Sequence, residues 1–249
     1  LRRETVPIKD VVDYPEEAFD RITRLTAKME EVVAEQVHAM KQEKAKRAEF
    51  EAWCREAKNF LDRNPSGWVT PMPALLSTNT NTVINASGEL VTNGERKEGD
   101  FKLRLPLEES WLAAIRLELL PGESGTITRG GGAASVRLSA ALAAGTNAEP
   151  TKLEFHHAEA THKEPRYANG YEIIGVKDAW RTSGKHDREP QSAVYLLKQP
   201  RRLNAGDALI VTLRSDALAR VRVWATPFSA ADPLESGARP ELVQALAKA

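Results

Sequence analysis

The stretch 111–123, with the sequence WLAAIRLELLPGE, decides the fold of this chain. From Ile115 to Leu120, aliphatic residues alternate with Arg116, Glu118 and a final leucine. A period of two predicts a strand with one buried face and one mostly solvated face. Pro121 and Gly122 then end the strand with a turn. Such a strand needs partner strands, so the stretch predicts a β-sheet protein.

Shorter runs of the same kind occur on both sides of this stretch, and turn residues separate them. Many short strands without intervening helices predict an antiparallel β-sandwich or jelly roll. We also expect 209–213 and 221–224 to form a late antiparallel pair, joined by the loop 214–219. The expected strands are 68–70, 75–78, 82–85, 90–92, 100–105, 113–120, 134–141, 151–160, 193–197, 208–215 and 220–226.

The chain before this β region predicts a helical arm. Residues 16–62 contain no glycine and no proline and are rich in strong helix formers. Apolar residues recur every three or four positions from Phe19 to Met40, fade across 41–47 and resume at Phe50. One helix of roughly 70 Å fits this pattern, at about 1.5 Å per residue, and so does an antiparallel helical hairpin. Either way the apolar stripe needs a cover, which predicts contact with other domains of a parent protein or with a second copy.

Asn64–Gly67 (NPSG) predicts the main boundary in the chain. Pro65 cannot continue a helix, and asparagine and glycine favour turns. We therefore expect a helical arm at 1–64, with an irregular lead-in over 1–14, and a β-sandwich at 65–228. Residues 229–249 are expected to be a tail that ends in a short helix beginning at Pro240.

Composition excludes several classes of protein. The 249 residues contain 35 Lys plus Arg against 35 Asp plus Glu, without the basic excess typical of nucleic-acid modules. No apolar run approaches the roughly 18 residues of a membrane-spanning helix. The single cysteine, Cys54, excludes an internal disulfide framework and a cysteine-based zinc site. Nothing places a nucleophile beside a base, so we expect no enzyme.

Several weak motifs occur in a fixed order along the chain. They are Trp68 followed by a Pro71 region, SGELVTNG at 87–94, IRLELLPGE at 115–123, GYEIIGVKDAWRTSG at 170–184, SAVYLL at 192–197 and LARVRVWAT at 218–226. Together they resemble the β-domain inserted in large multidomain proteins of planctomycetes, which pair a cytochrome-c-like segment with domains of unknown function. In that family a coiled-coil-like segment with a tryptophan near its end precedes the domain, matched by 50–53, and a Pro-led helix follows it.

The resemblance implies a non-catalytic interaction or spacer domain of a larger exported, haem-linked protein, periplasmic or extracellular and connected with polysaccharide breakdown. It implies a galactose-binding-like sandwich, and no cofactor in this chain, since the haem motif would lie outside it. The chain departs from the family's polar residues around 135–140, and Gln191 stands where a histidine is frequent. Of a Gly-Trp pair only Trp180 remains, so a ligand site of the relatives would be eroded.

An alternative function comes from a long polar loop that contains Trp180, Arg181, His186, Asp187 and Arg188. An exposed indole beside charged groups can stack on a sugar ring and hydrogen-bond its hydroxyls. This pattern is typical of a carbohydrate-binding module that takes polysaccharide. The competing interpretation is that Trp180 plugs the edge of the sandwich while its neighbours are solvated.

Two further groups of residues contain side chains of the kind that bind metals. His156, His157 and His162 lie close in sequence, but alternation along a strand puts the first two on opposite faces, so we predict no metal site there. Asp100 and Asp207 each follow a glycine and could contribute to a structural calcium site, although turn chemistry predicts the same residues.

Overall fold

The computed structural model describes residues 16–78, 81–93, 98–145, 149–173, 175–216 and 218–248. The chain forms two compact units, residues 1–54 and residues 55–249. The division falls inside a helix, before the boundary expected after residue 64. The lead-in predicted for residues 1–14 lies outside the described residues.

Two helices occupy the N-terminal region, α1 (Glu16–Gln42) and α2 (Lys44–Arg63). Helical hydrogen bonds continue past the break at Glu43, whose amide donates to Ala39 O at 3.2 Å and whose carbonyl accepts from Arg47 N at 2.9 Å. The break falls where the apolar stripe fades. Whether the arm acts as one rod or as a hairpin stays a prediction. Among the described residues, no helix is both long and apolar enough to cross a membrane.

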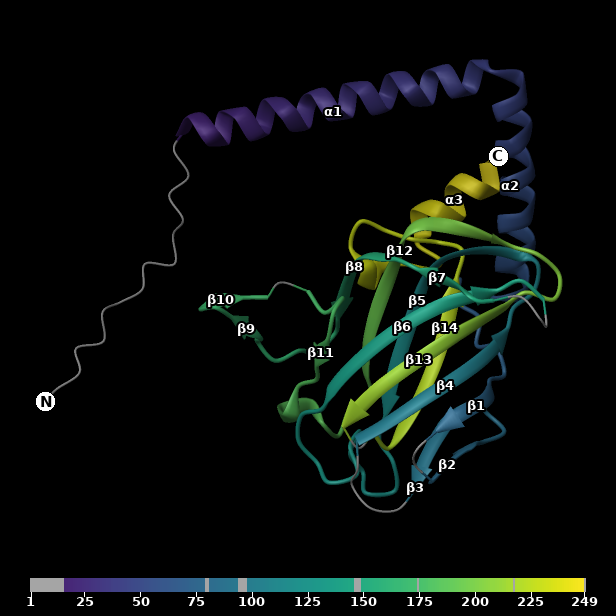
Figure 1. The fold of residues 1–249 in the computed structure, drawn as a ribbon. Helices are drawn as coiled ribbons and strands as arrows, with labels where there is room; N and C mark the ends of the chain where they lie inside the picture. The colour runs from purple at the N-terminus through teal and green to yellow at the C-terminus, as the bar shows by residue number, and fades with distance from the viewer. Residues whose placement is uncertain are drawn as a thin grey trace, which may run out of the picture. The chain divides into compact units, whose positions relative to one another are not determined.

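The β unit contains two antiparallel sheets (Figure 1), which confirms the prediction of a mainly β protein with helices at its N-terminus. Sheet I has the order β1-β4-β13-β6-β11, with β7 also paired to β6. Its strands are β1 (Ala74–Thr78), β4 (Glu98–Pro106), β6 (Ser135–Ala143), β7 (Thr151–Leu153), β11 (Trp180–Arg181) and β13 (Ala208–Asp216).

Sheet II has the order β2-β3-β14-β5-β12-β8 and lies behind sheet I in the view of Figure 1. Its strands are β2 (Asn81–Ile84), β3 (Leu90–Asn93), β5 (Ser110–Leu120), β8 (Phe155–Ala160), β12 (Gln191–Leu203) and β14 (Arg220–Thr226). A separate two-stranded hairpin pairs β9 (Tyr167–Ala168) with β10 (Tyr171–Glu172). Residues 68–70, expected as a strand, contribute only an isolated bridge between Val69 and Ala225.

The core lies between the two sheets and is built from alternate residues of their strands. In β5 the predicted alternation holds from Ile115 to Leu120, and Leu117 and Leu119 are fully buried. The outer face of β5 differs from the expectation, because Arg116 and Glu118 are half-buried rather than solvated. Leu112, Ala113 and Ala114 are all buried, so this end of the strand is covered on both faces.

Two expected strand arrangements are wrong. β13 and β14 follow each other in sequence but lie in different sheets, β13 between β4 and β6 and β14 between β3 and β5. The expected strand at 151–160 is divided at Glu154, with β7 in sheet I and β8 in sheet II. Periodicity reports which face of a strand is buried, and both sheets bury one face of these strands against the same core.

Helical segments close one end of the β unit. In the C-terminal part of α2, Ala57 and Phe60 are buried, and the Phe60 ring meets Phe228 edge-on with ring centres 5.7 Å apart. Glu56 forms an ion pair with Arg202 of β12. At the other end of the unit's sequence, α3 (Pro240–Lys248) begins at the proline that predicted it.

Stacking and hydrogen-bond contacts cover the outer side of β5 and β14 in sheet II. The Arg116 guanidinium lies between two indole rings, 4.7 Å from the centre of Trp68 and 4.5 Å from that of Trp224. Trp224 Nε1 donates to Glu118 at 3.1 Å. Cation–π contacts of desolvated groups contribute up to about 2 kcal/mol. The outer side of β5 and β14 is therefore packed around Arg116.

Glu89, just before β3, lies beside this packed region and pairs with β14. Its side chain is only 2% exposed and pairs with both Arg220 and Arg222 of β14. Asn85 Nδ2 donates to the same carboxylate at 2.9 Å. Burial alone would raise the pKa of Glu89, but the hydrogen bonds from Arg220, Asn85 and Arg222 together hold that pKa below its ordinary value.

We predict that Glu89→Gln lowers the free energy of unfolding by about 3 kcal/mol near neutral pH, because two arginines lose a buried partner. Since the pKa of Glu89 is depressed on folding, its ionised form stabilises the protein above the ordinary carboxyl range, about pH 4.3, and this contribution is lost as the pH falls through the lower folded value. The difference between the variant and the wild type should therefore shrink in acid. Urea unfolding at several pH values measures it.

Glu154→Gln is the matched control, because the Glu154 ion pair with Lys198 is exposed on both sides and such pairs contribute less than about 1 kcal/mol. Equal losses of stability in the two variants at neutral pH would contradict the role given to Glu89.

Candidate functional site

Trp180 lies where it cannot act as a sugar-stacking platform, which favours the competing interpretation that it plugs the edge of the sandwich. It belongs to β11, opposite Val136 of β6, and its side chain is fully buried in the core. Its indole nitrogen donates to the carbonyl of His162 at 2.9 Å. The indole therefore plugs the edge of the sandwich, while the next residue along the chain, Arg181, is exposed.

The neighbouring residue Arg181 is exposed and serves a local contact. Its Nε donates to Glu164 Oε2 at 2.7 Å, and the other carboxylate oxygen of Glu164 accepts from Gly184 N at 3.0 Å. The hydrogen bonds from Arg181 and from the Gly184 amide lower the pKa of Glu164. Arg181 and Glu164 thus tie the loop after β8 to the short 3₁₀ helix η1 (Gly184–His186).

Asp187 connects η1 to a glycine turn on the other side. Its carboxylate accepts from Gly132 N at 2.8 Å, and its carbonyl accepts from Ile127 N at 2.7 Å. Gly131 and Gly132 have φ values of 71° and 81°, a conformation that favours glycine. Arg188, the next residue, is exposed. Asp187, one of the predicted ligand-binding residues, therefore uses its hydrogen bonds to hold η1 against the segment 127–132.

Gln191, which stands where the family resemblance has a frequent histidine, lies close to His186 in the structure. Gln191 is fully buried, and its side chain accepts from Ser183 N at 2.9 Å. The same side chain donates to Ser183 O at 2.8 Å and to His186 O at 2.9 Å. Gln191 therefore fixes the backbone of η1 and the position of His186.

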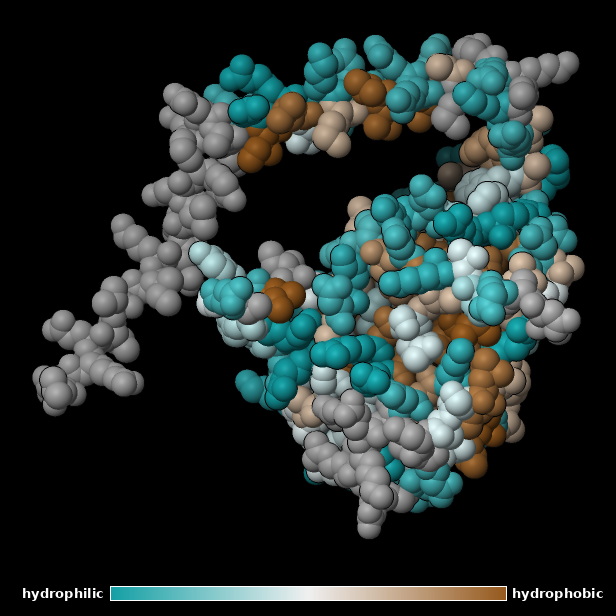
Figure 2. Space-filling model, viewed as in Figure 1, coloured by the Kyte–Doolittle hydropathy of each residue, from teal (hydrophilic) through white to brown (hydrophobic). Residues whose placement is uncertain are grey.

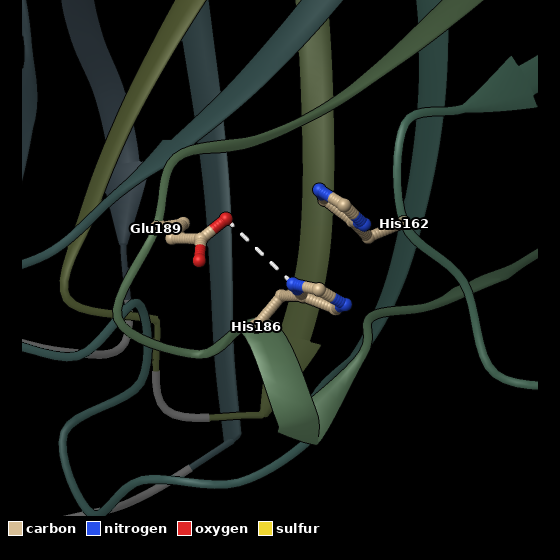
Figure 3. Close-up of side chains that lie close together, drawn as sticks. All are labelled: His162, His186 and Glu189. Carbon is tan, nitrogen blue, oxygen red and sulfur yellow. Dashed lines mark ion pairs between the residues drawn. The ribbon is translucent and has the colours of Figure 1, made fainter.

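The structure places His162 beside His186 and not with the two histidines of β8 (Figure 3). His162 stacks on His186, with ring centres 4.0 Å apart and ring planes 15° from parallel. Glu189 Oε2 lies 3.6 Å from His186 Nδ1. His156 is exposed and His157 half-buried on neighbouring positions of β8, as alternation predicts. The sequence grouped His162 with these two because they are near in the chain, whereas folding brings it to a histidine twenty-four positions later.

The two aspartates considered for calcium lie at opposite ends of sheet I. Asp100 pairs with Arg214, and Asp207 precedes the pair formed by Ala208 and Pro106. Six residues of β13 separate these positions, about 20 Å at the usual rise. Asp207 also accepts from Asn204 N at 2.8 Å as part of a turn. These two carboxylates cannot share one ion.

The outer face of sheet I is open and polar. One row across its strands contains Asp100, Arg214 and Arg137, and the next contains Lys102, Thr212 and Ser139. These side chains point outward because their neighbours Phe101, Leu103, Leu138 and Leu213 fill the core. Figure 2 views this side of the molecule and shows hydrophilic residues spread over it, with hydrophobic ones between them and along one side.

A shallow groove of about 430 Å³ follows these rows. Arg214 makes two hydrogen bonds to Asp100, at 2.9 and 3.1 Å. Lys102 and Arg137 are exposed and form no ion pair with any carboxylate in the described part of the chain. Three cationic side chains therefore meet one carboxylate in this groove, with Ser77, Ser139 and Thr212 as hydroxyl neighbours.

Sequence reasoning missed this groove, although a signal was present. Polar and cationic residues alternate with apolar ones in β4, β6 and β13, which reveals the outward positions of each strand. The strand order was not available from the sequence. Without the pairing of β13 with both β4 and β6, Lys102 and Arg137 have no known relation to each other.

No protein-family model matches this chain, and no curated protein matches it. A xylan-binding module of low affinity, CBM86 from the gut symbiont Roseburia intestinalis, is 8% identical, with 61% of this chain and 93% of that module covered and a TM-score of 0.20. The enzymatically active domain of tailspike protein 4 from bacteriophage CBA120 is 13% identical, with 67% and 20% covered and a TM-score of 0.19. At these TM-scores neither similarity bears on function.

Proposed function

We propose that the β unit is a non-catalytic binding module for acidic polysaccharide, and that the groove on the outer face of sheet I is its binding surface. The observation that carries this proposal is the open groove in which Lys102 and Arg137 are exposed and, among the residues that the structure describes, have no carboxylate partner. Carboxylate groups of a ligand would form charge-assisted hydrogen bonds with these cations. The proposal keeps the carbohydrate-binding function expected from sequence but assigns it to the groove on sheet I instead of the Trp180 loop.

The spacing of the cations favours an extended ligand. Lys102 lies on β4 and Arg137 on β6, with β13 between them. Two strand spacings amount to about 10 Å, and the two rows are about 7 Å apart along the strands. This separation of the two backbone positions suits a chain with repeated acidic groups that lies across the rows.

The lining favours a sugar polymer over a nucleic acid. Single strands are bound through aromatic side chains on which bases stack, but Phe101, the aromatic residue that contributes to the groove, is buried. The hydroxyls of Ser77, Ser139 and Thr212 match the hydroxyls and carboxylates of uronic-acid residues. The chain also lacks a general basic excess.

The finer fold assignment belongs to this proposal. We regard the β unit as a jelly-roll, galactose-binding-like sandwich, because several consecutive strands along the chain, such as β4, β5 and β6, alternate between sheets I and II. This assignment is an analogy of architecture and does not itself locate a ligand.

We predict that the double variant Lys102→Ala/Arg137→Ala weakens binding to polygalacturonate about a hundredfold, because each cation contributes a charge-assisted hydrogen bond of roughly 1.5 kcal/mol. Affinity electrophoresis or calorimetry with sodium polygalacturonate measures this. Binding of the wild type should weaken with added salt.

Lys198→Ala/Arg201→Ala is the matched control, since it removes one lysine and one arginine from exposed positions of β12 in the other sheet. It should change the affinity less than twofold. Starch is the neutral comparison, and equal binding of starch would overturn the electrostatic assignment. Tighter binding of single-stranded DNA than of polygalacturonate would replace the polysaccharide by a nucleic acid.

A second function is favoured by the apolar stripe of α1. Six of its residues, each 42–68% exposed, recur at three- and four-residue intervals: Ile22, Leu25, Met29, Val32, Val33 and Val37. A stripe of this kind is covered by association in most soluble proteins. We propose that α1 pairs with α1 of a second copy, since acidic and basic residues are interspersed along the helix and allow interhelical ion pairs.

The parent protein expected from the resemblance fits both functions. We propose that this chain is an interaction domain of an exported, haem-linked planctomycete-type protein. The haem would be bound outside these residues. The groove would then hold the assembly on polysaccharide, and α1 would join copies or neighbouring domains.

We predict that the wild type sediments as a dimer at about 100 µM and that Leu25→Gln/Met29→Gln sediments as a monomer, because polar residues remove the apolar contact while keeping helix propensity. Sedimentation equilibrium provides the measurement. Glu30→Gln/Glu31→Gln is the control on the same helix and should leave the dimer intact. A wild-type monomer at this concentration would exclude self-association through α1.

A further inference from the structure

We propose that His162, His186 and Glu189 form a binding site for a divalent transition metal, with Zn²⁺ as the ion it suits best. This site is separate from the polysaccharide groove and does not depend on it. Figure 3 shows the two imidazoles and the carboxylate facing a common space. One candidate ligand atom from each residue lies within 4.8 Å of the other two.

The spacing of these atoms is close to that of a metal site. In a tetrahedral zinc site with bonds of about 2.0–2.1 Å, ligand atoms lie roughly 3.4 Å apart. His186 Nδ1 and Glu189 Oε2 are already 3.6 Å apart. The stacked rings of His162 and His186 need to tilt by side-chain rotation so that a nitrogen of each faces the ion. Both rings are half-buried and Glu189 is exposed, so each side chain has room to rotate.

The ligand atoms are not committed to other partners. Within the described part of the chain, no hydrogen bond involves a ring nitrogen of His162 or His186, whereas His156 Nδ1 lies 3.1 Å from Leu197 O. The 3.6 Å separation between His186 and Glu189 is longer than a hydrogen bond. A metal would therefore give these atoms their first strong partner instead of competing with an existing one.

The backbones that carry the two histidines are held firmly. The His162 carbonyl accepts from the buried Trp180, and the His186 carbonyl accepts from the buried Gln191. One residue before His162, Thr161 N donates to Ser192 O at 2.9 Å, which extends the pairing of β8 with β12. Glu164 adds a bond to Gly184 N. A site on tethered backbone loses little entropy when its side chains gather round an ion.

The donor set selects the class of metal. Two imidazole nitrogens and one carboxylate oxygen suit Zn²⁺, and also Cu²⁺ and Ni²⁺, whereas Ca²⁺ and Mg²⁺ prefer shells made entirely of oxygen. Three protein ligands leave a fourth position, which water fills in such sites. A bound ion would join the loop after β8 to the loop between η1 and β12. It would thus add a cross-link at the edge of sheet II that includes β8 and β12.

Zinc titration of the full chain without a histidine tag tests this assignment. We expect calorimetry with ZnCl₂ to give one ion per chain and the thermal midpoint of unfolding to rise with zinc. His162→Gln and His186→Gln should each weaken zinc binding more than about tenfold, the scale on which even outer-shell changes act. With Cu²⁺ in place of zinc, electron paramagnetic resonance should show coupling to imidazole nitrogens that both variants reduce.

The chain supplies matched controls. His156→Gln and His157→Gln remove histidines of β8 outside the cluster and should leave zinc affinity unchanged. Glu189→Gln alters an exposed side chain without disturbing the fold and should also weaken binding, which keeps the test valid if a histidine variant unfolds. The proposal is overturned if the wild type takes up no zinc, if His186→Gln binds as tightly as the wild type, or if His156→Gln loses the ion equally.

Discussion

Burial of the inner faces of sheets I and II against each other is the interaction on which the other features depend. Leu117 and Leu119 of β5 and Val211 and Leu213 of β13 belong to this one core, and all are fully buried. Each such side chain contributes about 2 kcal/mol when it leaves water. Because the inner faces are committed to the core, only the outer faces and the loops are available for function.

The outer faces of sheets I and II differ in how far their charged side chains are paired and exposed. On sheet II, Arg116 lies between Trp68 and Trp224. Glu89 pairs with Arg220 and Arg222, so these charged groups have partners within the protein. On sheet I, Lys102 and Arg137 stay exposed at similar outward positions. The difference lies in the neighbouring residues, since sheet I has small hydroxyl side chains where sheet II has tryptophan and glutamate.

Much of the β unit could be predicted from local periodicity, and its assembly could not. The alternation from Ile115 to Leu120 identified the central strand, and β14 begins and ends where the pattern of Val221 and Val223 indicated. Alternation does not say which sheet a strand joins, so β13 and β14 were paired wrongly. For Trp180 the sequence left two interpretations open, a sugar platform and an edge plug, because local polarity does not show which side chains tertiary contacts bury. The partners of His162 and Lys102 required the fold itself.

The passage of the chain between sheets has a kinetic consequence. β7 and β8, which flank Glu154, lie in different sheets, and so do β13 and β14. Strands that follow each other in the chain therefore form few pairings early in folding. Sheet I can pair β4 with β13 only after about a hundred intervening residues have been brought together, and a topology rich in such distant pairings folds slowly. The helix α1, built from contacts within single turns, forms orders of magnitude faster. During synthesis the arm therefore acquires its structure well before the sandwich behind it can close.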